Sequence, residues 1–92
     1  AERVMRPFVG DDIPVAALRG ILSRALSVFP QANPAPVINL GDDGYLLELF
    51  HGPTLAFKDV ALQFLGQLFT ALLEGRAGDR VTIVGATSGD TG

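Results

Sequence analysis

The chain has 92 residues, of which 18 % are charged and 48 % hydrophobic, and its net charge is −3. This length allows one small domain or a piece of a larger one, and it excludes a two-domain enzyme. The mean hydropathy is positive, +0.34, and so small a chain cannot bury that many apolar residues internally. We therefore expect further sequence, or self-association through exposed apolar surface.

Charge and composition exclude several classes of function. The seven Lys and Arg residues are scattered and the net charge is negative, which argues against a nucleic-acid partner. Cysteine is absent, which excludes disulfides, thiolate metal sites and cysteine nucleophiles, and we expect no metal site. The most apolar stretch, residues 60–73, is too short to span a bilayer, and no signal peptide is visible. We expect a cytoplasmic protein without a membrane partner.

The first half of the chain predicts a helix followed by a β-hairpin. Asp11 and Asp12 can cap a helix that carries Pro14 in its first turn, and apolar residues then recur at helical spacing until Pro30 ends the helix. Further on, two apolar runs, residues 37–40 and 45–50, flank the turn sequence Gly-Asp-Asp-Gly, which is typical of a hairpin.

The second half predicts a buried helix and then a buried strand. Residues 57–73 are apolar except for one narrow polar stripe at helical spacing, so we expect this helix to be covered on most sides. Residues 81–85 form a β-branched run that predicts a strand of a parallel sheet, with the helix packed on it. The small-residue turn 86–92 follows this strand.

Lys58 is the only lysine in the chain, and it falls at the start of the predicted apolar helix. Partial burial and the positive end of a helix both disfavour an ammonium ion, and a neutral amine is the nucleophile that Schiff-base chemistry requires. The alternative is a solvent-facing lysine that pairs with Asp59 or Glu48. Spacing alone favours the solvent-facing lysine.

The turn 86–92 is the second candidate for chemistry. Its hydroxyls and glycine N–H groups can converge on an anion where another helix would begin. Neither the phosphate-binding spacing G-x-x-x-x-G-K-[ST] nor the dinucleotide pattern G-x-G-x-x-G is present. The alternative is an ordinary turn in which Ser88 or Asp90 caps the next helix.

Taken together, four segments of the chain resemble, in the same order, the threonine synthases, which are pyridoxal-phosphate enzymes of the tryptophan-synthase-β-like fold. The segments are Phe8–Pro14, Leu47–Thr54, Ala56–Gly66 and Gly85–Gly92. The resemblance covers nearly the whole chain, and it implies the N-terminal part of a longer threonine synthase-like chain.

The resemblance implies an α/β fold, built here from an N-terminal helix, a β-hairpin, a buried helix and one strand of a parallel sheet. The whole chain is then one segment, in which residues 1–50 supply the helix and hairpin and residues 51–92 begin the cofactor-binding α/β domain. The loop that holds the cofactor phosphate and the partner of the pyridine nitrogen belong to parts of the family's sequence outside this chain.

The resemblance also implies roles for individual residues. Lys58 matches the lysine that holds pyridoxal 5′-phosphate as a Schiff base, and Asp90 matches a cofactor-contacting position that is asparagine in sister enzymes such as cysteine synthase. A further set matches the loop that grips the substrate carboxylate: Thr87, Ser88, Gly89 and Thr91. For His51, which belongs to the resemblance, we expect a hydrogen-bonded loop residue.

The implied activity is the conversion of O-phosphohomoserine and water to L-threonine and phosphate. The spacing of the segment around Lys58 argues against two other lyases of the same fold, threonine dehydratase and cysteine synthase, which stay as alternatives. A further alternative is a non-catalytic folding or interaction module. We expect little or no catalysis from residues 1–92 alone.

Overall fold

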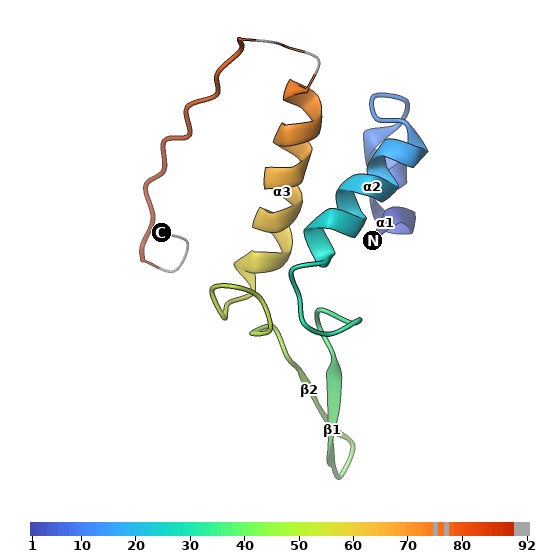
Figure 1. The fold of residues 1–92 in the computed structure, drawn as a ribbon. Coiled ribbons are helices and arrows are strands. Elements are labelled where there is room, and N and C mark those ends of the chain that lie inside the picture. Colours follow the sequence, from blue (N-terminus) through green and yellow to red (C-terminus); the bar gives the residue numbers. More distant parts are fainter. Residues whose placement is uncertain (75, 77, 90–92) are drawn as a thin grey trace.

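The structure is a computed structural model, and it describes residues 1–74, 76 and 78–89. Three helices and a two-stranded hairpin follow one another along the chain: α1 (Glu2–Val9), α2 (Val15–Leu26), β1 (Val37–Gly41), β2 (Gly44–Leu47) and α3 (Lys58–Leu73). Helix α2 lies between α1 and α3, and the hairpin projects away from the helices (Figure 1). No helix in this part of the chain is long and apolar enough to cross a membrane.

Helix α2 carries the core. The buried apolar side chains are Leu18, Ile21, Leu22, Ala25 and Phe29. The first four recur at helical spacing on one face of α2, which packs against α3 and α1. An ion pair from Arg19 to Glu2, 2.7 Å long, also joins α2 to α1.

The predicted first helix is confirmed, but its ends differ. Pro14, rather than Asp11 or Asp12, stands at the N-cap position, and no side chain caps α2. The helix ends at Leu26, four residues before Pro30, and the Ser27 hydroxyl donates to the carbonyl of Arg24 at 2.7 Å. Helix α1 was not predicted, because Pro7 lies within it and it buries no residue.

The predicted hairpin is confirmed. Val37 pairs with Leu47 and Asn39 with Tyr45 in antiparallel register. Asp42 and Asp43 at the turn both have positive φ, 46° and 59°, which is the conformation that two-residue hairpin turns require.

Helix α3 begins one residue after the predicted start, but it is not covered on most sides. Only Asp59 of its residues is buried. Arg24 of α2 donates to Gln67 of α3 at 3.1 Å, so part of the polar stripe faces α2, while apolar residues such as Leu62 and Leu65 are exposed. Helix α3 is apolar on several faces, and α2 covers only one of them.

The predicted parallel strand is not confirmed, because the structure has no strand over residues 81–85. Residues 81–85 are exposed, with Ile83 at 78 % and Val84 at 89 % exposure, so the expected burial of this run is not seen. The chain turns back after α3 and runs in the opposite direction (Figure 1). The physical reason is pairing: among the described residues, the one sheet is the hairpin, so no strand offers hydrogen bonds to this run.

The molecule is elongated. Its radius of gyration is 15.9 Å, against about 12 Å for a compact domain of this length. Large apolar side chains are exposed in every part, including Phe8 at 87 % and Leu55 at 72 %. The expectation that the apolar residues would not all find cover within the chain is therefore confirmed.

Candidate functional site

Lys58 is the first residue of α3, and it is presented by the segment Gly52–Asp59, which we call the lysine loop. The loop begins with a turn in which the Leu55 N–H donates to the Gly52 carbonyl at 3.1 Å. Leu55 has φ 60°, a left-handed conformation that is unusual for a residue with a branched side chain. Lys58 itself is half-buried. The local backbone is therefore sharply bent just before the lysine.

Asp59 organises this loop. Its side chain is 1 % exposed, and its carboxylate accepts three hydrogen bonds from the preceding residues. The Thr54 N–H donates to Oδ2 at 3.0 Å, the Thr54 hydroxyl donates to Oδ1 at 2.7 Å, and the Ala56 N–H donates to Oδ2 at 3.4 Å. Each carboxylate oxygen therefore has a partner within the loop.

These contacts keep Asp59 ionised. Burial by itself would raise the pKa of Asp59, but the hydrogen bonds from Thr54 and Ala56, together with the positive charge of Lys58, outweigh it and lower the pKa below its ordinary value of 3.8. A fixed negative charge therefore lies next to the lysine in the sequence.

Glycine at position 52 allows the close approach. A Cβ atom at Gly52 would overlap the Cβ and the carboxylate of Asp59. The backbone of the turn and the Asp59 side chain are in direct contact, so a larger residue at this position must displace one of them.

The hairpin leads into the loop through His51. His51 Nε2 lies 2.9 Å from Glu48 Oε1, and Gln31 Nε2 lies 3.4 Å from His51 Nδ1. Its ring also stacks at a tilt on Phe50, with centroids 4.6 Å apart. The prediction of a hydrogen-bonded loop histidine is confirmed. Of the two acidic candidates for pairing with Lys58, Glu48 pairs with His51, and the Asp59 carboxylate accepts hydrogen bonds from the loop.

The second candidate, the turn 86–92, is described as far as Gly89. Thr87, Ser88 and Gly89 are exposed, and the Gly89 N–H donates to Thr87 Oγ1 at 3.2 Å. Asp90 and Thr91 lie outside the described residues.

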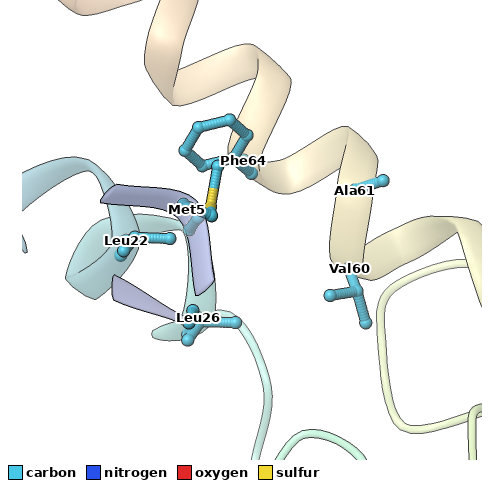
Figure 2. A pocket seen from close by; sticks show the side chains of 8 residues that line it. Met5, Leu22, Leu26, Val60, Ala61 and Phe64 are labelled. Atoms are coloured by element: carbon cyan, nitrogen blue, oxygen red, sulfur yellow. The ribbon is translucent and has the colours of Figure 1, made fainter. Parts of the chain in front are cut away.

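A cavity of about 260 Å³ lies between α1, α2 and α3 (Figure 2). Met5, Leu22 and Leu26 face Val60 and Phe64 across it, and its lining is almost entirely apolar. It offers no charged or hydroxyl side chain to a phosphate or a carboxylate, and none of the predicted site residues lines it. This cavity is therefore not where the predicted site residues lie.

The part that Asp59 plays in organising the loop was not predicted from the sequence, where Asp59 is only a possible ion-pair partner of Lys58. The signal that could have found it is a carboxylate in the first turn of a predicted helix, preceded by a Gly-Pro-Thr turn whose N–H groups need acceptors.

Comparison with known proteins gives a consistent result. No family model matches the chain. The threonine synthase of Pseudomonas aeruginosa is 54 % identical over 92 residues, which is the whole of this chain and 19 % of that protein. The threonine synthase of Escherichia coli is 48 % identical over 91 residues, 98 % of this chain and 19 % of that protein. Over its whole length, the chain is similar to this part of threonine synthases.

A solved structure agrees. The pyridoxal-phosphate-bound threonine synthase from Brucella melitensis superposes with a TM-score of 0.84 at 46 % identity, over 98 % of this chain and 19 % of that one. These matches confirm the resemblance to threonine synthases that four short segments indicated. The chain spans about a fifth of the length of the threonine synthases it matches.

Proposed function

We propose that this segment belongs to a longer polypeptide that converts O-phosphohomoserine and water to L-threonine and phosphate, with pyridoxal 5′-phosphate as cofactor. The observation that carries the proposal is the lysine loop: the only lysine of the chain stands at the start of a helix, on a backbone that a buried carboxylate shapes. Whole-length similarity to threonine synthases supports the proposal.

The residues present suit the cofactor. A half-buried primary amine at a helix start is the donor that an aldehyde cofactor requires, and the neighbouring carboxylate is held by the loop. Lys58 would hold the cofactor through Nζ. When bound, pyridoxal phosphate supplies an electron sink for negative charge on the substrate carbons.

Lys58 has a second task in this proposal. An amine released from the cofactor can take a proton from the α carbon of the substrate and return one later. A lysine on a fixed backbone suits this task, because proton transfer requires hydrogen-bond reach of the carbon.

The turn 86–92 supplies the substrate contacts in this proposal. The hydroxyls of Thr87, Ser88 and Thr91 are donors suited to a carboxylate, and Gly89 belongs to the same proposed set of contacts. Because Thr87 Oγ1 already accepts the Gly89 N–H, its own O–H is directed elsewhere and can donate. Asp90 is assigned to the cofactor.

The exposed apolar surfaces have a place in the same proposal. The threonine synthases that this chain matches are about five times its length. The remaining polypeptide would cover the exposed side of α3 and pair with residues 81–85. Residues 1–50 would then supply the first helix and the hairpin, and residues 51–92 would begin the cofactor-binding domain. Self-association of the isolated chain stays a prediction, as does its lack of activity.

The test is made on the longer polypeptide that contains this segment. We expect O-phosphohomoserine to give equal amounts of threonine and phosphate, Lys58→Ala to abolish both products, and the control Arg76→Ala, at an exposed basic residue outside the loop, to leave them unchanged. Release of a 2-oxo acid and ammonia in place of threonine would assign a dehydratase, and full activity of Lys58→Ala would overturn the proposal.

A further inference from the structure

Asp59 has two properties that its neighbours in α3 lack. It is the one buried charged side chain among the described residues, and every hydrogen bond that its carboxylate accepts comes from the loop before Lys58. A buried carboxylate is costly unless its oxygens are satisfied, and here both are. Its contacts therefore define one arrangement of the loop.

At Gly52, the backbone of the turn lies directly against the Asp59 side chain. The Asp59 side chain fills the space that a Cβ at position 52 would need, so the turn is wrapped directly against the carboxylate. The chain from Gly52 to Ala56 is thus held at three points: by contact at Gly52, by two hydrogen bonds at Thr54 and by one at Ala56.

Consecutive residues in a helix project about 100° apart, because the helix has 3.6 residues per turn. A side chain at position 58 therefore cannot share the direction in which Asp59 reaches back to the loop. The hydrogen bonds of Asp59 therefore act on the lysine through the backbone that the two residues share, beside the charge interaction between the two side chains.

We propose that Asp59 is the positioning residue of the lysine, which fixes the turn Gly52–Ala56 and thereby the start of α3 from which the Lys58 amine is presented to the cofactor aldehyde. This inference rests on the proposed function. Asp59 does not itself touch the cofactor in this proposal. Its effect is on the rate at which a correctly placed amine attacks, which is sensitive to misplacements of about 1 Å.

The experiment follows cofactor attachment in the cofactor-free form of the longer polypeptide. Pyridoxal phosphate is added, borohydride stops the reaction at set times, and peptide mass spectrometry gives the fraction of Lys58 modified. Lys58 is the only lysine of the segment, so its peptide reports one amine. Circular dichroism of each variant confirms that it is folded.

Three variants separate the hydrogen bonds from the charge. Asp59→Ala removes all three acceptor contacts, and Thr54→Val removes only the hydroxyl contact. Asp59→Asn preserves the arrangement, because its amide oxygen can accept both N–H groups while its NH₂ donates to the Thr54 hydroxyl. Asp79→Ala, at an exposed aspartate outside the loop, is the matched control.

We expect Asp59→Ala to slow attachment at Lys58 by about 10-fold or more, Thr54→Val to slow it by less, and Asp59→Asn and Asp79→Ala to stay within about 3-fold of the wild type. Attachment at the wild-type rate in both Asp59→Ala and Thr54→Val would overturn the positioning role while leaving the proposed function intact. A wild-type protein that never carries the cofactor on Lys58 would overturn the proposed function, and the positioning role with it. Equal loss in Asp59→Asn and Asp59→Ala would also overturn the role, because it would assign the effect to the charge.

Discussion

The two candidates for chemistry, Lys58 with its loop and the turn 86–92 that follows the predicted strand, differ in how the structure holds them. The second is described only as far as Gly89. In the lysine loop, the backbone groups of Thr54 and Ala56 find an acceptor in Asp59, at most five residues away. In residues 81–89, one local hydrogen bond joins Gly89 to Thr87, and the β-branched run before it is exposed. The contacts that shape the lysine loop are local in sequence, whereas no strand among the described residues pairs with residues 81–85.

The largest effect that would sharpen this comparison is expected from Gly52→Ala. The added Cβ overlaps the Asp59 side chain, so the loop must open or shift. We expect the free energy of local opening, measured from exchange of the Thr54 amide, to fall by about 2 kcal/mol or more.

Gly66→Ala is the matched control for that change. A Cβ at Gly66 meets nothing within 4 Å, and alanine is the better helix former. We expect it to leave the Thr54 amide unchanged and to stabilise α3 by about 0.5–1 kcal/mol. Equal exchange of the Thr54 amide in both variants would show that the close approach at Gly52 does not stabilise the loop.

A smaller effect is expected from the second region. In the longer polypeptide, Thr87→Ala and Ser88→Ala should weaken substrate binding by about 1–3 kcal/mol and leave the cofactor on Lys58, because each removes one donor to the carboxylate. Substrate titrations and the modified fraction of Lys58 measure the two quantities separately. Loss of the cofactor with substrate binding intact would move these residues to the cofactor side of the site.

The smallest effect at neutral pH is the pH dependence of the lysine loop. The pKa of Asp59 is lowered in the folded loop, so its ionisation stabilises the loop above the ordinary value of 3.8, and this contribution is lost as the pH falls through the lower, folded value. We expect the protection of the Thr54 amide, corrected for the intrinsic exchange rate, to be constant above about pH 5 and to fall only in the acid range. In Asp59→Asn this acid loss should disappear, and its persistence would assign it to another group.

Helix α3 and the hairpin could be predicted from the sequence because their signals are local. A long apolar run with one polar stripe specifies a helix whatever surrounds it, and Gly41–Gly44 between two apolar runs specifies the turn. Resemblance in four short segments was also sufficient to indicate the threonine synthases, which the whole-length matches confirm.

The rest could not be predicted, because it depends on contacts that a pattern does not contain. Residues 81–85 have the composition of a buried strand, but a strand exists only where another pairs with it. Helix α1 contains Pro7 and buries no residue, so neither its propensity nor its pattern indicated a helix. The role of Asp59 depends on the direction in which its side chain reaches, and spacing along the chain does not give that direction.

The most direct test of the contrast between the two regions is amide hydrogen exchange by NMR on the 92-residue chain. We predict that the Thr54 amide exchanges about 100-fold or more slowly than an unstructured peptide, while the Ile83 and Val84 amides exchange within about 10-fold of it. In Asp59→Ala, the Thr54 amide should lose most of its protection and the other two should not change. A Thr54 amide that exchanges as fast as those of Ile83 and Val84 in the wild-type chain would contradict the claim that the lysine loop is held by its own local contacts.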